Sequence, residues 1–184
     1  MTTATPIVPL TTAQIGKCGE LLVQYRLLKH AVEASAMPTD AGIDLVAYSS
    51  ASRRTVTIQV KANLRAKPGG GKGSMALDWW APQQSPAELF ALVDLESDQV
   101  WLFWKEELAR FAQQKPEGRL HFYMYVDADV RTRGVGKHVR EFDAFKIEKR
   151  VAEIFGKSQS TSDFPIVADT RHAVADQTQE YVES

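Results

Sequence analysis

Three residues on two neighbouring predicted strands have side chains suited to chemistry at a phosphate group. The stretch "GIDLVAYSS" (42–50) carries Asp44, and "TVTIQVKA" (55–62) carries Gln59 and Lys61. Carboxylate and amide oxygens are ligands that a hard cation such as Mg²⁺ accepts. A lysine ammonium cannot bind the metal, but it can neutralise a phosphate oxygen or orient an attacking water. The three side chains together predict metal-assisted chemistry at a phosphate.

The alternation of side chains along a strand predicts how these residues are positioned. In "TVTIQVKA" the two valines and the isoleucine share one face, which can bury against a helix, while Gln59 and Lys61 point to the other face. If the two strands pair through the turn "SSASR", Asp44 can approach both residues. We therefore expect a carboxylate, an amide and an ammonium to converge near one edge of a sheet.

This arrangement resembles the PD-(D/E)xK nuclease superfamily, in which an acid on one strand is followed, on the next, by an acid or amide, any residue and a lysine. The matching residues are Asp44 and Gln59-Val60-Lys61. Glu20, in "GKCGELLVQYRLL", matches the glutamate that the family often carries in its first helix. The run is most similar to the branch with archaeal Holliday-junction resolvase-like nucleases and a group I intron homing endonuclease. The resemblance covers residues 14–62 well and the later strands loosely.

The resemblance implies an α/β fold with a restriction-endonuclease-like core, a central mixed β-sheet flanked by helices. It implies an endonuclease that hydrolyses DNA phosphodiester bonds with Mg²⁺, for which Mn²⁺ could substitute. Glu20, Asp44 and Gln59 would then be metal ligands and, together with Lys61, the catalytic residues. DNA would be the partner, and members of this fold often act as dimers or higher homo-oligomers.

Two departures from the family pattern keep other functions open. Gln59 stands where an acid is common; some members carry Gln there, but one negative charge toward the metal is lost. Asp44 follows Ile43 rather than a proline, while Pro38 lies upstream with Asp40 as an alternative ligand. The first alternative is a non-catalytic nucleic-acid- or protein-binding module on the same fold. The second is an immunity or assembly protein whose acidic remainder meets a basic partner.

Hydrophobic periodicity and turn residues predict the elements that carry these residues. A helix is expected over 11–34, with an apolar stripe of Ile15, Cys18, Leu22, Tyr25, Leu28 and Val32. Strands are expected at about 43–49, 54–62, 88–95, 99–104 and 120–128. A short helix is expected at "KEELARFAQQ" and an amphipathic helix over 140–156, with "RAKPGGGKGS" as a flexible basic loop without regular structure.

The formal net charge of −1 hides an uneven distribution. Residues 53–72 hold six basic residues and no acid, and residues 130–150 hold seven basic residues against three acids. Charge clusters are usually solvated faces, but two basic stretches near one site also suit contact with a polyanion. The predicted nucleic-acid contacts are Arg53, Arg54, Arg65, Lys67, Lys72, Arg131, Arg133, Lys137 and Arg140.

Some further residues have two interpretations each. Gln24 follows Glu20 by one helical turn and could reach the same cleft. Trp79 and Trp80 could stack on bases, although such residues are more often core or subunit contacts. "GGGKG" lacks the spacing of a phosphate-binding loop, but it could contact DNA as a mobile loop. The four histidines show no metal-ligand spacing and are interpreted as surface or structural: His30, His121, His138 and His172.

The composition is that of a globular protein. The chain of 184 residues is long enough for one domain, expected over 1–156, with a polar C-terminal tail over 157–184. We expect no transmembrane helix and no secretory signal. The single cysteine, Cys18, excludes an internal disulfide and a Cys-rich zinc site. A reducing compartment, the cytoplasm, fits these features.

Overall fold

A five-stranded mixed sheet, sheet A, forms the centre of the protein. The computed structural model describes residues 9–39, 41–69, 73–130 and 137–156. Sheet A has the strand order β1-β2-β3-β6-β7, with β1 at Val32–Ala36, β2 at Leu45–Ser49, β3 at Arg54–Asn63, β6 at Leu89–Asp94 and β7 at Gln99–Trp104. Strand β3 pairs antiparallel with β2 and parallel with β6, so the sheet is mixed.

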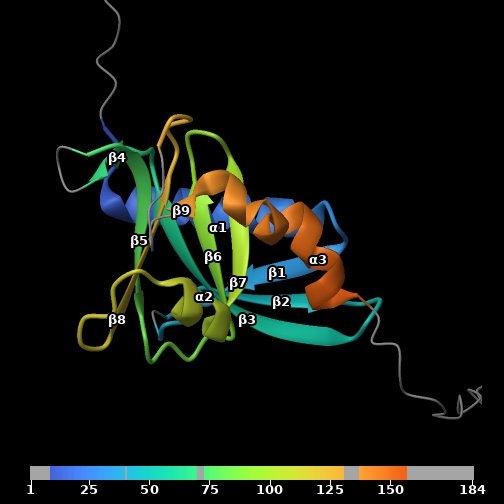
Figure 1. Cartoon of the computed structure of the whole chain (residues 1–184). Coiled ribbons are helices and arrows are strands. Elements are labelled where there is room, and N and C mark those ends of the chain that lie inside the picture. The colour runs from blue at the N-terminus through green and yellow to red at the C-terminus, as the bar shows by residue number, and fades with distance from the viewer. Residues whose placement is uncertain (1–8, 40, 70–72, 131–136, 157–184) are drawn as a thin grey trace, which may run out of the picture.

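A second sheet and four helical segments surround sheet A (Figure 1). Sheet B has the order β4-β5-β8-β9, with β4 at Lys67–Pro68, β5 at Met75–Pro82, β8 at Arg119–Tyr125 and β9 at Lys137–His138. The helices are α1 at Thr12–Leu28, α2 at Lys105–Phe111, the 3-10 helix η2 at Val139–Phe145 and α3 at Ile147–Phe155. The expectation of an α/β fold with a central mixed sheet flanked by helices is confirmed.

Helices α1 and α3 cover one face of sheet A (Figure 1). Val23 and Leu27 of α1 and Ile154 of α3 are fully buried against the inward side chains of β2, β3 and β6. Arg26 of α1 and Glu148 of α3 form an ion pair, with a 2.9 Å hydrogen bond from Arg26 Nε. Burial opposes ionisation of this carboxyl, but the Arg26 hydrogen bonds outweigh it and lower the pKa of Glu148.

Sheet B packs against the opposite face of sheet A. Its inward residues, such as Leu77 and Phe122, meet Phe90 and Phe103 of sheet A. Phe142 of η2 packs edge to face on Phe103, with ring centroids 5.8 Å apart. Strand β6, the parallel neighbour of β3, is therefore buried on both faces.

Helix α1 is shorter than the sequence predicts. It begins with a capping box, in which Thr11 Oγ1 accepts from the Gln14 amide nitrogen at 3.3 Å and the Gln14 side chain accepts from the Thr11 amide. It ends at Leu28 instead of near residue 34, and Ala31 takes a positive φ of 57° in the turn that follows. Residues 32–36 then pair with β2 as strand β1, so the prediction of a helix to residue 34 was wrong.

The predicted apolar stripe of α1 is only partly right, because Leu22 packs against the core but the fully buried residues lie on another row. The buried residues are Gly19, Val23 and Leu27, whereas Tyr25 and Leu28 are exposed. Gly19 sets this orientation, because a Cβ atom there would lie 2.6 Å from the Cβ of Ala62. Because Gly19 has no side chain, α1 packs directly on β3. The buried face of α1 is therefore the one that contains Gly19, and not the one with the most apolar residues.

The other predicted elements have mixed outcomes. Four strands match β2, β3, β6 and β7 closely; the strand predicted over 120–128 matches β8, and "KEELARFAQQ" forms α2. The helix predicted over 140–156 is two helices, because Lys146 has an extended ψ of 140° between η2 and α3. The "RAKPGGGKGS" segment contains the short strand β4, and sequence reasoning also missed β5 and β9.

Among the described residues, no helix is long and apolar enough to cross a membrane. The polar tail predicted over 157–184 lies outside the described residues.

Gly16 and Gly19 give a matched test of how α1 packs. Replacing a helix-interior glycine with alanine normally stabilises a helix by about 1 kcal/mol. We expect this gain for Gly16→Ala, because no atom lies within 4 Å of a Cβ at that position. We expect Gly19→Ala to destabilise the protein by about 1–3 kcal/mol, because of its overlap with Ala62. Urea unfolding of both variants measures the difference.

The double variant Gly19→Ala/Ala62→Gly is the control, since it removes the opposing methyl group. It should recover much of the stability lost in Gly19→Ala. An equal gain in stability for Gly16→Ala and Gly19→Ala would contradict the close packing of α1 on β3.

Candidate active site

The alternation of β3 divides its side chains between the two buried layers. Val56, Ile58 and Val60 lie in the layer beneath α1 and α3. Gln59 and Lys61 point to the other face, as the sequence pattern predicts. Their neighbours across the parallel pairing with β6 are Phe90 and Leu92.

Asp44 continues the pairing of β2 with β3 by one residue. The register joins Leu45 to Ile58, and the Asp44 amide donates to the Ile58 carbonyl at 2.9 Å. Asp44 Oδ2 then accepts a hydrogen bond of 2.6 Å from the backbone amide of Val60. The carboxylate is thus fixed at the residue between Gln59 and Lys61, at the edge where β2 begins.

Gln59 is a buried polar residue in an apolar layer. Its exposed fraction is 5%, and its Oε1 atom is buried without a hydrogen-bond partner among the described residues. A buried amide oxygen without a donor costs about 1–3 kcal/mol. The loop before β2 lies beside this side chain, because a Cβ on Gly42 would be 4.0 Å from Gln59 Nε2. Gly42 itself has a positive φ of 81° and lies close to Pro86.

Lys61 is half-buried at the C-terminal half of β3. Within the part of the chain that the structure describes, no hydrogen bond or ion pair engages its ammonium group. Since a lysine ammonium is a strong donor, this group is available to an anion such as a phosphate oxygen.

Glu20 is placed near β3 by its helix, but its carboxylate is paired elsewhere. It follows Gly19, the residue that packs on β3, and it forms an ion pair of 2.8 Å with Lys17 in the preceding turn. Gln24, one turn further on, donates through Nε2 to the Ala34 carbonyl of β1 at 2.9 Å. Glu20 thus lies on the helix that covers the face of β3 opposite to Gln59 and Lys61, while Gln24 joins that helix to β1.

The oxygen donors at this edge are of the type that Mg²⁺ takes. A hard divalent cation is held by one or two carboxylates with neutral oxygens and water. The Asp44 carboxylate and the unpartnered Gln59 Oε1 fit this donor set. No group of three or more His, Cys, Asp or Glu side chains that could hold a metal ion occurs in the described ranges. Asp40, the alternative ligand, lies outside them.

The structure separates the predicted nucleic-acid contacts into different regions. Arg54 begins β3, about 23 Å along the strand from Lys61, and Arg53 precedes it. The Arg54 guanidinium lies 5.2 Å from the Trp104 ring. Arg65 and Lys67 instead follow the end of β3 that is near Lys61.

The second basic stretch is partly engaged in internal contacts. Lys137 forms an ion pair of 3.4 Å with Glu141. Arg140 donates to His138 Nδ1 at 3.1 Å and to the Ala128 carbonyl at 3.0 Å. Three predicted contacts lie outside the described residues: Lys72, Arg131 and Arg133.

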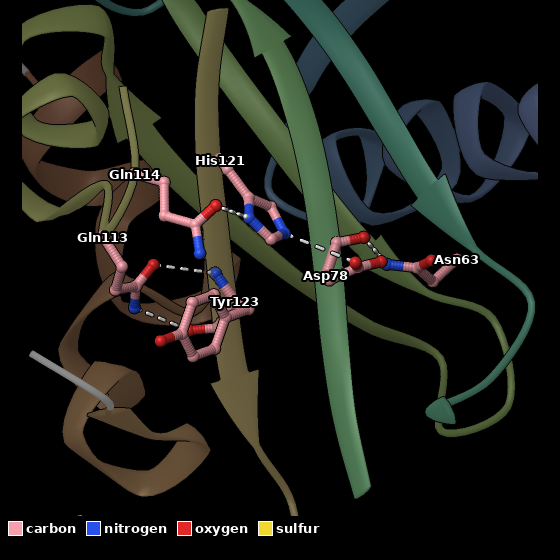
Figure 2. A network of polar contacts seen from close by, with 6 residues as sticks. All are labelled: Asn63, Asp78, Gln113, Gln114, His121 and Tyr123. Carbon is pink, nitrogen blue, oxygen red and sulfur yellow. Dashed lines mark hydrogen bonds and ion pairs between the residues drawn. The ribbon is translucent and has the colours of Figure 1, made fainter. Parts of the chain in front are cut away.

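Sequence reasoning missed a polar network between the end of β3 and sheet B (Figure 2). Asn63 Nδ2 donates to the Asp78 carbonyl at 2.6 Å, and Asp78 Oδ2 lies 3.3 Å from His121 Nε2. The Gln113 side chain holds the backbone of Tyr123 through two hydrogen bonds, of 2.8 and 3.0 Å. Burial and the neighbouring Tyr125 raise the pKa of the Tyr123 phenol. The alternation in "MALDWWAP" and "RLHFYMY" is the signal that could have revealed this face.

Comparison with known proteins gives a likeness at the level of fold. No protein-family model matches the chain. No curated protein matches it significantly. Among solved structures, the bacterial homing endonuclease I-Ssp6803I matches with a TM-score of 0.50 and 17% sequence identity, over 74% of this chain and 86% of that chain. MepB matches with a TM-score of 0.36 and 12% identity, over 70% of this chain and 94% of that chain, and this distant likeness supports no inference. The chain therefore shares its α/β fold with a bacterial homing endonuclease.

Proposed function

We propose that this protein is a divalent-metal-dependent endonuclease that hydrolyses DNA phosphodiester bonds. The main support is the hydrogen bond from Val60 to Asp44, which holds a carboxylate between Gln59 and Lys61. The same arrangement lies on a fold shared with a homing endonuclease. The fold alone would leave the activity open, because one fold can host unrelated functions.

The proposed roles follow from the chemistry of each side chain. Asp44 and Gln59 Oε1 would hold Mg²⁺, or Mn²⁺ in its place; Glu20, on the helix that covers the other face of β3, would have to leave its ion pair with Lys17 to join them. A divalent cation, when bound, supplies positive charge that polarises the phosphate. The Val60 amide keeps the Asp44 carboxylate in place, so little reorganisation is needed before the reaction.

Lys61 would act on the substrate directly. Its ammonium can donate hydrogen bonds to a non-bridging phosphate oxygen, where negative charge builds up as water attacks the phosphorus. It can also orient that water, since the amine has three donors and no competing partner among the described residues.

The remaining proposals concern DNA binding, the oligomeric state and the cellular compartment. Arg65 and Lys67, near the end of β3, would contact the DNA backbone, and this predicts binding that weakens with salt. A homo-oligomer, a dimer or larger, would place one site on each strand of the DNA. A DNA substrate and a single cysteine fit the cytoplasm.

Cleavage of DNA is the direct test. We expect the wild-type protein to nick supercoiled plasmid or cut branched DNA with Mg²⁺ or Mn²⁺ and to be inactive in chelator. Lys61→Ala and Asp44→Asn should each lower the cleavage rate by about 100-fold or more, as loss of a preorganised electrostatic contact does. Gel assays of product against time measure these rates.

Lys29→Ala is the matched control, because this lysine is exposed at the C-cap of α1 and, among the described residues, its ammonium lies over the Tyr25 ring. It should cleave at the wild-type rate. If no DNA is cleaved by the wild type, while DNA binding survives in all variants, the chain is a non-catalytic binding module instead.

Gln59→Leu tests whether the buried amide is kept for function. The substitution removes an unpartnered polar atom from an apolar layer, so the free energy of unfolding should stay within about 1 kcal/mol of the wild type or rise. Cleavage should nevertheless fall to the level of Asp44→Asn. Unfolding in urea and the plasmid assay, made on the same sample, give both values. Loss of stability by several kcal/mol would assign the amide a structural role.

Asp44 should also contribute to stability through its backbone contact. Asp44→Ala leaves the Val60 amide without its acceptor, and a hydrogen bond to a charged group contributes about 1.5–3 kcal/mol. Asp44→Asn keeps an oxygen acceptor, so it should lose less stability than Asp44→Ala. Urea unfolding, together with hydrogen exchange of the Val60 amide, distinguishes the two variants. Equal stability of both would mean that the contact contributes little.

A further inference from the structure

The outer face of sheet B carries a row of aromatic and polar side chains that the proposed cleavage does not use. Leu77 and Phe122 point inward to the core, so the alternate residues of β5 and β8 point outward. The register places Trp80 beside His121 and Asp78 beside Tyr123. The outer face therefore displays rings from both strands around one carboxylate.

These rings form a row of contacts, in which Trp80 and His121 are stacked, His121 and Tyr123 are tilted, and Tyr123 and Tyr125 meet edge to face. The Trp80 and His121 rings are parallel within 3°, with centroids 4.1 Å apart. The Arg119 guanidinium lies 4.7 Å from the Trp80 ring, on β8. His121 lies 5.4 Å from Tyr123, which lies 5.6 Å from Tyr125. Such a row gives sheet B an aromatic surface with a cation beside it, a combination that single-strand-binding proteins use to contact unpaired bases.

A cavity of about 520 Å³ opens beside this row of rings. Ligand pockets are commonly about 300–1,000 Å³, so its volume is adequate for a nucleobase. Its polar lining combines carboxylate, amide, imidazole, phenol and ammonium groups, from Lys67, Asp78, Gln114, His121, Tyr123 and Tyr125.

The network in Figure 2 fixes the polar edge of this cavity. His121 lies between two acceptors, Asp78 Oδ2 and Gln114 Oε1, each 3.3 Å from a ring nitrogen. The Asp78 side chain is 52% exposed, and a carboxylate has more lone pairs than this one contact uses. It can therefore accept two further hydrogen bonds from a ligand edge.

The cavity is joined to the proposed catalytic strand. Asn63, whose side chain bonds to the Asp78 carbonyl, follows Lys61 by two residues on the same face of β3, about 7 Å along the strand. Lys67 lies on the cavity wall and Arg119 beside Trp80, so cations are available for backbone phosphates. A nucleic-acid strand that meets Lys61 can thus extend to this face.

We propose that the outer face of sheet B binds an unpaired base of the nucleic-acid substrate, with guanine preferred. This inference rests on the proposed function and specifies its substrate class, DNA with unstacked bases such as a branch point or single strand. A duplex stacks its bases and pairs their edges, so it cannot offer a free ring to the pocket. Guanine presents adjacent N1–H and N2–H donors to the Asp78 carboxylate, whereas thymine has a single N–H between two carbonyl oxygens that the carboxylate repels.

Binding to labelled oligonucleotides in EDTA tests the pocket without cleavage. The probes are a fluorescein-labelled dT strand, the same strand with one central dG, and a fully paired duplex. We expect the wild type to bind the dG strand about fivefold or more tightly than the dT strand, and the duplex more weakly than either. Asp78→Asn should bring the ratio of the two single-strand affinities close to one.

Trp80→Ala should weaken binding to both single strands about fivefold or more, because it removes the ring that stacks on His121, a residue of the cavity wall, and that Arg119 packs over. Tyr48→Ala is the matched control, since Tyr48 is 40% exposed and Trp80 is 37% exposed, but Tyr48 lies on β2. It should bind as the wild type does. Equal wild-type affinity for the dG and dT strands, or an unchanged ratio in Asp78→Asn, would overturn the proposal.

The test separates this inference from the proposed function. Lys61→Ala should keep the guanine preference, because it removes no pocket side chain. A preserved preference in a protein that cleaves nothing would support the pocket and reject the catalysis. Cleavage by a protein with no preference for an unpaired guanine would reject the pocket alone.

Discussion

The backbone of strand β3 needs hydrogen-bond partners along both edges, but each neighbouring strand pairs with only part of its length. Strand β2 pairs with its first half, up to Ile58, and β6 pairs with its second half, from Ile58 onward. Beyond Ile58 the ladder on the β2 side would end, and the Asp44 carboxylate accepts from Val60 at that point. Burial of an unpaired backbone amide is costly, so this side chain completes the sheet at the position where the proposed chemistry needs an anion.

Asp44 both completes the hydrogen bonding of β3 and supplies the proposed metal ligand. These two roles explain why the edge of β3 near Val60 is polar although apolar layers lie on both faces of the sheet. One face of β3 is closed by α1, and the other faces the aromatic layer between the sheets. Gln59 lies in that second layer without a partner for its oxygen, a cost that packing alone would select against. Such a defect is expected where function, rather than stability, determines the residue.

The sequence predicts the parts of this structure that depend on local patterns. Period-two alternation assigned β3 and its two faces, and apolar runs bounded by turns located β6 and β7. Strand β1 could not be predicted in this way, because "VEASA" becomes a strand only by pairing with β2. The orientation of α1 depends on a glycine contact with Ala62, which no hydrophobic pattern reports. Asp44, Gln59 and Lys61 were expected at one edge of the sheet. The hydrogen bond from the Val60 amide to Asp44 and the internal contacts of Lys137 and Arg140 depend on the tertiary structure, so the sequence pattern could not predict them.

The Val60 contact has a consequence for how such a protein can diverge. The group that holds Asp44 is a peptide N–H, which every residue except proline supplies. The side chain at position 60 needs only to fill space beneath α1, so many apolar residues would serve there. Because part of the site is encoded in the main chain, substitutions can accumulate around it without altering its geometry. Two chains with little sequence likeness can in this way share one architecture, as this protein and I-Ssp6803I do at 17% identity.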